Sequence, residues 1–281
     1  MKHHESRFKG VRGADIFYQS WLPEGEPSAS LLIVHGLAEH SGRYTNLVEH
    51  FVPRGFAVYG VDHVGHGRSS GKRVFVERFD DFISVLQTYV GMIRDWQPRV
   101  PLFMVGHSLG ALIGAVYLLD HQEDLAGAVL SGPLVKVPDN ISPVTVLLSR
   151  VLSVLLPKLG VAAVDASGVS RDPAVVRAYV DDPLVYCGKT TARLGCEMLK
   201  AMHRVTREAP RIELPLLVLQ GSEDRLVSPD GAEMLHRAAG SADKTLKIYH
   251  GLHHEIYNEP EQAEVFANVE AWLRQRVNSR Q

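Results

Sequence analysis

The 281-residue sequence lacks the features that mark several classes of protein. Its only two cysteines, Cys187 and Cys196, are too few for a disulfide framework and do not form paired zinc-ligand motifs. No run of eighteen apolar residues occurs, and residues 1–10 are charged and polar. We therefore expect neither a transmembrane helix nor a secretory signal. A reducing, cytoplasmic location is expected.

Charge is also close to balanced. The 30 lysines and arginines face 32 aspartates and glutamates, and there is no long basic run of the kind that grips a phosphate backbone. Nucleic acid is therefore not expected as a partner. With 45% hydrophobic residues the chain can bury one sizeable core, so residues 1–281 are predicted to form a single domain.

Short apolar runs alternate with longer helix-period stretches, which is typical of an α/β fold with parallel strands and helices on both faces of the sheet. The predicted parallel strands are 31–35, 57–61, 102–106, 128–131 and 216–220, followed by a last strand at 245–249. The predicted helices are 44–54, 79–96, 111–121, 231–239 and 261–277.

Two segments depart from this alternation. Residues 8–11 and 15–21 flank Arg12-Gly13 and predict an N-terminal antiparallel hairpin at the edge of the sheet. Residues 132–210 contain no evident parallel strand, and they interrupt the fold where ligands bind in open α/β sheets. They are predicted to form a helical cap inserted into the domain.

The candidate nucleophile is Ser108. It lies in Gly106-His107-Ser108-Leu109-Gly110, directly after a predicted strand and before a predicted helix. In that context the G-x-S-x-G pattern forms a turn so tight that glycines must flank the serine, which raises its hydroxyl above the sheet. The pattern predicts a serine hydrolase.

A serine hydroxyl needs an imidazole base held by a carboxylate. Asp224 follows the strand at 216–220 and is the preferred acid; Glu223, Asp230 and Asp243 are weaker candidates. The loop after the last strand offers His253 and His254, between which spacing alone does not choose. These adjacent histidines with Glu255 do not fit the zinc-protease pattern, so no metal is expected.

Acyl transfer also needs two backbone N–H donors for the oxyanion. One is predicted at Leu109, the residue after the nucleophile. The second is predicted at Leu37, in the loop His35-Gly36-Leu37 after the first parallel strand.

Several segments together resemble the monoacylglycerol lipases of the α/β-hydrolase fold. They are the serine pentapeptide and residues 35–44 (HGLAEHSGRY), 221–226 (GSEDRL), 244–249 (KTLKIY) and, within the insertion, 154–159 (VLLPKL), 170–171 and 182–184. The resemblance covers nearly the whole chain. It implies that Ser108, Asp224 and His254, rather than His253, form the catalytic triad, with Leu37 and Leu109 at the oxyanion positions. It further implies that Glu39 and Arg43 form a polar end that binds glycerol.

Tyr257 stands where some members of the family carry a further histidine, so the expected contacts to glycerol differ there.

Residues 142–156 have an unusually wide apolar surface for a short helix. Such a helix either packs inside the protein or against a partner subunit, or it lies on a membrane surface. The resemblance favours transient membrane contact, with Leu147 and Leu148 as candidate contacts for substrate and lipid.

The predicted reaction is hydrolysis of a monoacylglycerol, or a similar single-chain lipid ester, to fatty acid and glycerol without a cofactor. The alternatives are a lysophospholipase, a general carboxylesterase, or a ligand-binding module that kept the fold but not the activity. The sequence gives no indication of the oligomeric state.

Overall fold

The computed structural model describes residues 1–137 and 150–278. Their central feature is an eight-stranded sheet with the order β1-β2-β4-β3-β5-β6-β9-β10. The strands are β1 (Lys2–Lys9), β2 (Asp15–Leu22), β3 (Ala29–Val34), β4 (Phe56–Val61), β5 (Leu102–His107), β6 (Gly127–Ser131), β9 (Leu216–Gly221) and β10 (Lys244–Tyr249). Pairing from β4 to β10 is parallel throughout, and β2 joins β4 antiparallel. The predicted α/β fold is confirmed.

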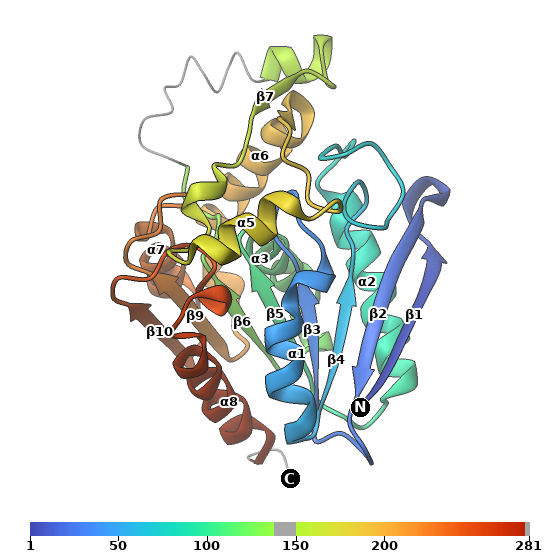
Figure 1. Ribbon diagram of the computed structural model, residues 1–281, viewed down its shortest axis with the longest axis vertical. Coiled ribbons are helices and arrows are strands. Elements are labelled where there is room, and N and C mark those ends of the chain that lie inside the picture. The colour runs from blue at the N-terminus through green and yellow to red at the C-terminus, as the bar shows by residue number, and fades with distance from the viewer. Residues whose placement is uncertain (138–149, 279–281) are drawn as a thin grey trace.

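Helices cover both faces of this sheet (Figure 1). On one face lie α1 (Thr45–Phe51) and α8 (Gln262–Asn278), and on the other lie α2 (Asp80–Trp96), α3 (Leu109–His121), α6 (Ala192–Glu208) and α7 (Asp230–Ala238). Because strand side chains alternate, Leu32 joins one core and Leu31 joins the other. Burial on both faces explains the continuous apolar runs of the central strands.

The predicted N-terminal hairpin is present at the edge of the sheet, but its first strand was placed wrongly. Strand β1 runs from Lys2 to Lys9 rather than over 8–11, and Val11–Gly13 form the turn. Most side chains of β1 are exposed. Its backbone pairs with β2 without needing an apolar face, so hydrophobic alternation could not reveal it.

The inserted region between β6 and β9 contains β7 (Gly160–Ala162), α5 (Pro173–Asp181), β8 (Thr190–Thr191) and α6 in its described part. Figure 1 shows β7 and α5 above the carboxyl ends of the parallel strands. Helix α6 descends beside α3, and its Leu194, Met202 and Val205 are buried in the main core. It thus provides the crossover from β6 to β9, whereas 132–210 as a cap unit stays a prediction. No helix in the described ranges is long and apolar enough to cross a membrane.

Candidate active site

Ser108 occupies a strained turn between β5 and α3. Its φ of 55° and ψ of −118° place it in a region that non-glycine residues rarely adopt. A Cβ on Gly110 would lie 1.8 Å from the Val34 carbonyl oxygen, and one on Gly106 would lie 2.7 Å from the Gly110 carbonyl oxygen. Both glycines are therefore required for the helix to approach the sheet so closely. The turn is the one predicted from the pentapeptide.

Asp224 and His254 are brought together from the loops that follow β9 and β10. The Nδ1 atom of His254 lies 2.7 Å from Asp224 Oδ2, and both side chains are almost fully buried. The amide of Gln220 donates to Oδ2 at 2.8 Å, while the backbone N–H groups of Leu226 and Val227 donate to Oδ1. The carboxylate is thereby fixed in one orientation and leaves Nε2 of His254 available as a base.

The two members of this pair shift each other's pKa. Burial alone would raise the pKa of Asp224, but the charge of His254 and the hydrogen bonds it receives lower it below its ordinary value. Burial alone would lower the pKa of His254, but the Asp224 charge and hydrogen bond raise it above its ordinary value. The Asp224 carboxylate thus favours the imidazolium that forms when His254 accepts a proton.

Ser108 and His254 line the same cavity, which has a volume of about 270 Å³. Among the described residues no hydrogen bond joins the Ser108 hydroxyl to His254. Catalytic hydrogen bonds of this type commonly tighten only when substrate is bound. The two groups share one reaction space above the carboxyl ends of the strands.

His253 makes no hydrogen bond to Asp224 within the described part of the chain. Its backbone N–H donates to Glu259 at 3.1 Å, and its Nδ1 atom is buried without a partner in the described part of the chain. The structure therefore pairs His254, not its neighbour, with Asp224. The weaker acid candidates Asp230 and Asp243 instead form ion pairs with Lys136 and Arg276.

Leu37 lines the same cavity as Ser108, and Leu109 follows the nucleophile directly; their role as oxyanion donors stays a prediction. Leu109 is the first residue of α3, where helical N–H groups have no partner in the preceding turn. Within 1–137 and 150–278, neither of these N–H groups donates a hydrogen bond. Gly36 packs against Ser108, with an added Cβ lying 3.3 Å from the serine Cβ. Unsatisfied donors at this position suit an oxyanion.

Glu39 and Arg43 belong to a buried ion network next to this cavity. Arg43 donates to Glu39 at 2.7 Å and to both oxygens of Glu255 at 2.6 and 2.8 Å, and it stacks over Tyr179 of α5 at 4.6 Å. Tyr44 also donates to Glu39, at 2.8 Å. Glu39 lines the cavity, whereas Arg43 lies behind it. Their binding of glycerol stays a prediction.

The pKa values of the two carboxylates in this network shift in opposite directions. Burial and the nearby Glu255 charge raise the pKa of Glu39, although Arg43 acts against them. Burial would also raise the pKa of Glu255, but the positive charge of Arg43 and its two hydrogen bonds lower it. Arg43 consequently holds Glu255 ionised.

Sequence reasoning missed several residues of the cavity. They are His107, Leu134, Tyr179, Leu226 and Glu255, together with Gln220 behind Asp224. Glu255 was considered only as a metal ligand, although its position directly after His254 was a usable signal. Tyr179 belongs to no recognisable motif, and it lines the cavity only because the inserted region folds so that α5 lies over the site. The predicted contacts Leu147 and Leu148 lie outside the described residues.

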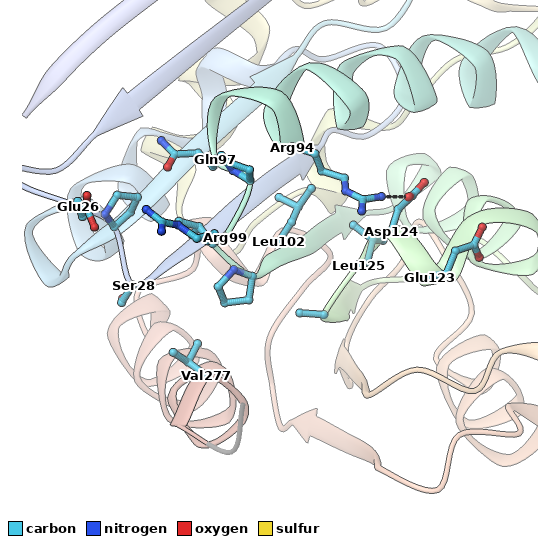
Figure 2. A pocket seen from close by; sticks show the side chains of 15 residues that line it. Glu26, Ser28, Arg94, Gln97, Arg99, Leu102, Glu123, Asp124, Leu125 and Val277 are labelled. Atoms are coloured by element: carbon cyan, nitrogen blue, oxygen red, sulfur yellow. Dashed lines mark hydrogen bonds and ion pairs between the residues drawn. The ribbon is translucent and has the colours of Figure 1, made fainter. Parts of the chain in front are cut away.

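A larger cavity, of about 530 Å³, lies far from this chemistry. Its lining includes Ser28, Leu102 and Ala126, at the amino ends of β3, β5 and β6, and Figure 2 shows Arg94 joined there to Asp124. Ser108 lies at the opposite, carboxyl ends. No cluster of potential metal ligands occurs within the described ranges.

A sheet of this order, with a serine raised on the turn after β5, is the architecture of the α/β-hydrolases, and this chain is one of them. Residues 25–261 match the protein family described as serine aminopeptidase, S33. The monoacylglycerol lipase of Paleococcus ferrophilus, a solved structure, superposes with a TM-score of 0.82 at 30% identity over 98% of this chain and 100% of that one.

Whole-length relatives define the family more closely. The chain is 39% identical to the monoacylglycerol lipase of Mycolicibacterium smegmatis over 96% of both proteins. It is also 39% identical to human monoglyceride lipase, over 94% of this chain and 88% of that protein. The chain belongs to the monoacylglycerol lipase family of carboxylic ester hydrolases.

Proposed function

We propose that this protein hydrolyses monoacylglycerols, using Ser108 as nucleophile, His254 as base and Asp224 to orient the imidazole. The observation that carries the proposal is the buried 2.7 Å contact between His254 and Asp224, next to a serine on a strained turn in the same cavity. The names of the relatives supply the substrate class.

The proposed steps assign a role to each of these groups. The Ser108 oxygen attacks the acyl carbonyl while Nε2 of His254 takes the hydroxyl proton, and the developing oxyanion is held by the N–H groups of Leu37 and Leu109. His254 then passes the proton to the departing glycerol oxygen, leaving an acyl-enzyme. A water molecule activated by His254 releases the fatty acid.

The cavity lining suits a lipid with one chain and a polar head. Apolar side chains at Leu37, Leu134, Val169, Leu226 and Val227 bound much of it, while Glu39 and Glu255 provide a polar region. Each methylene buried on the apolar side favours binding by about 0.8 kcal/mol. The polar carboxylates offer acceptors for glycerol hydroxyls.

A substrate comparison tests the proposal. Hydrolysis rates are measured for monoacylglycerols of increasing chain length, for di- and triacylglycerols, and for lysophosphatidylcholine of matched chain length. The rate should be highest for monoacylglycerols. Ser108→Ala should abolish turnover and labelling by a fluorophosphonate without lowering the thermal midpoint. Faster turnover of lysophosphatidylcholine would support the lysophospholipase alternative, and an unlabelled Ser108 in the active-site cavity would support the ligand-binding alternative.

We also propose that the inserted region contacts membrane surfaces. An apolar cap face of six side chains is 45–71% exposed: Val151, Val154, Leu155, Leu156, Leu159 and Val161. Large side chains grouped in this way are typical of surfaces that meet a partner or a bilayer. Figure 1 shows this region at the end of the molecule farthest from both termini.

Charge favours an anionic bilayer as the partner. Arg150, Lys158, Lys189 and Arg193 flank the apolar cap face, and residues 150–164 and 186–196 contain no acidic residue. The two segments lie together, because Ala192 N–H donates to the Leu159 carbonyl at 2.7 Å and Arg193 N–H to the Pro157 carbonyl at 3.1 Å. The whole chain carries a formal charge of −2. These two segments thus carry a net positive charge on a chain that is slightly negative overall, which suits anionic lipid headgroups.

Vesicle sedimentation tests this contact. The protein should bind phosphatidylcholine vesicles containing phosphatidylglycerol more strongly than pure phosphatidylcholine vesicles, and added salt should weaken the difference. The double variant Lys158→Glu/Lys189→Glu should remove the preference for vesicles that contain phosphatidylglycerol. Leu155→Ser should weaken binding to both kinds of vesicle. Arg99→Glu, at the opposite end of the sheet (Figure 2), is the matched control. Equal losses in Arg99→Glu and in the cap variants would contradict the proposal.

A further inference from the structure

His254 lies in a loop that has no regular secondary structure of its own. Residues 250–255, after β10, form neither helix nor strand. The hydrogen bond to Asp224 holds one side of the His254 ring, but the ring also moves with the backbone that carries it. A displacement of about 1 Å in a catalytic group can cost roughly 10²-fold in rate. The contacts that fix this backbone therefore matter for catalysis.

Two backbone N–H groups, one on each side of His254, are held by groups beyond residues 250–255. The N–H of Glu255 donates to the carbonyl of Val169 at 2.8 Å, and the N–H of His253 donates to the Glu259 carboxylate at 3.1 Å. Val169 belongs to the inserted region and also lines the active-site cavity. The inserted region thus contacts the backbone of the catalytic loop directly.

Glu259 is a buried carboxylate that Arg171 of the inserted region neutralises. The Glu259 side chain has no exposed surface. Its Oε2 atom accepts from Nε of Arg171 at 2.9 Å, and its Oε1 atom accepts from the Arg171 backbone N–H at 3.0 Å as well as from His253. An ionised carboxylate removed from water needs partners of this kind. The same guanidinium also binds Glu261, which is exposed.

We propose that Arg171 is a positioning residue for the catalytic base: by holding Glu259 in place, it fixes the backbone that carries His254. Arg171 directly precedes Asp172, whose side chain accepts from the first turn of α5. The segment before α5 then serves the chemical step itself and not only the binding of substrate. This role rests on the proposed ester hydrolysis and acts entirely through the loop.

Arg171→Met tests the role, because it keeps an unbranched side chain and removes the guanidinium. With a short soluble ester, acyl-chain binding and membrane contact contribute little. We expect kcat to fall by roughly 10- to 100-fold with KM within about twofold. Arg171→Lys keeps the charge without the planar fork and should recover part of the loss. Glu261→Gln is the matched control: it weakens only the exposed contact of Arg171, so kcat should not change.

A double variant shows whether Arg171 acts through Glu259. Glu259→Gln keeps an acceptor for the His253 N–H but loses the charge that Arg171 binds. If the two residues act as one unit, the double variant Arg171→Met/Glu259→Gln should lose no more kcat than the more damaging single variant. Losses that multiply would contradict the proposal.

Hydrogen exchange supplies a readout that does not require turnover. In the wild type, the backbone amides of His253 and Glu255 should be protected although they lie in a loop. Arg171→Met should speed their exchange far more than that of Met104 in β5, which a merely general loss of stability would not do.

Three results would overturn the proposal: unprotected amides in the wild type, an acceleration at His253 no larger than at Met104, or an unchanged kcat in Arg171→Met. Failure of the proposed function is a different result, in which the wild type does not hydrolyse monoacylglycerol. The exchange rates remain measurable in that case.

Discussion

The His254 imidazole is acted on by two opposing influences. Burial is the largest single influence and disfavours its charged form, but the charge and hydrogen bond of Asp224 at 2.7 Å, together with the charges of Glu255 and Glu39, outweigh it, so the pKa lies above 6.5. Only neutral His254 can act as a base. Activity should therefore be full above this pKa and be lost as pH falls through it. Initial rates of a soluble ester against pH should give an acidic limb with its midpoint above pH 6.5.

Asp224→Asn tests the same balance from the other partner. Without the carboxylate, burial is left as the main influence, so the pKa of His254 should fall and the acidic limb should move to lower pH. The rate at its plateau should fall by about four orders of magnitude, as when the orienting carboxylate of a serine protease becomes an amide. Asp230→Asn, on an exposed carboxylate paired with Lys136, should change neither quantity. An unshifted limb in Asp224→Asn would reject Asp224 as the orienting acid.

At the scale of elements, the contact between α3 and the sheet depends on missing side chains. Gly110→Ala would place a Cβ 1.8 Å from the Val34 carbonyl and 2.5 Å from that of His35. We expect a loss of more than about 3 kcal/mol in the free energy of unfolding, beyond the usual cost of overpacking, because the obstructing atoms are backbone. Urea denaturation measures it.

Gly91→Ala is the matched control for this substitution. Gly91 is exposed within α2, and an added Cβ meets nothing within 4 Å. It should therefore stabilise the protein by about 0.5–1 kcal/mol through helix propensity. If both alanine variants were equally stable, close packing would not explain the glycine at position 110.

Which elements were predictable follows from how each is stabilised. The central strands and α3 are buried on all sides, so their residues, such as Leu31 and Leu112, had to be apolar and formed recognisable runs. Strand β1 is held by backbone pairing at an exposed edge and has no such pattern. The triad residues follow strand ends in a fixed order, whereas Tyr179 and Gln220 depend on tertiary contacts that no local spacing encodes.

On the scale of the whole molecule, Arg43 connects three parts of the chain. It binds Glu39 in the loop after β3, Glu255 beside His254, and the Tyr179 ring on α5. Arg43→Met would leave two buried carboxylates without their cation and should lower the free energy of unfolding by about 3–5 kcal/mol. Chemical denaturation of the variant measures this loss.

The control is Arg78→Met, which removes an arginine from the exposed pair with Asp80. Exposed pairs of this kind contribute little, so its unfolding midpoint should match wild type. If Arg43→Met changed the free energy of unfolding as little as Arg78→Met does, the contacts of Arg43 with Glu39, Glu255 and Tyr179 would not be stabilising the fold.

The position of α6 has a consequence for how this protein can change. Among the described elements of the inserted region, α6 packs in the main core beside α3, whereas β7 and α5 lie above the carboxyl ends of the strands (Figure 1). We expect insertions or deletions in β7 or α5 to leave the strand register intact, because neither element pairs with the eight-stranded sheet. New substrate specificities can thus arise through changes in the elements above the active-site cavity, while the catalytic residues at the strand ends stay the same.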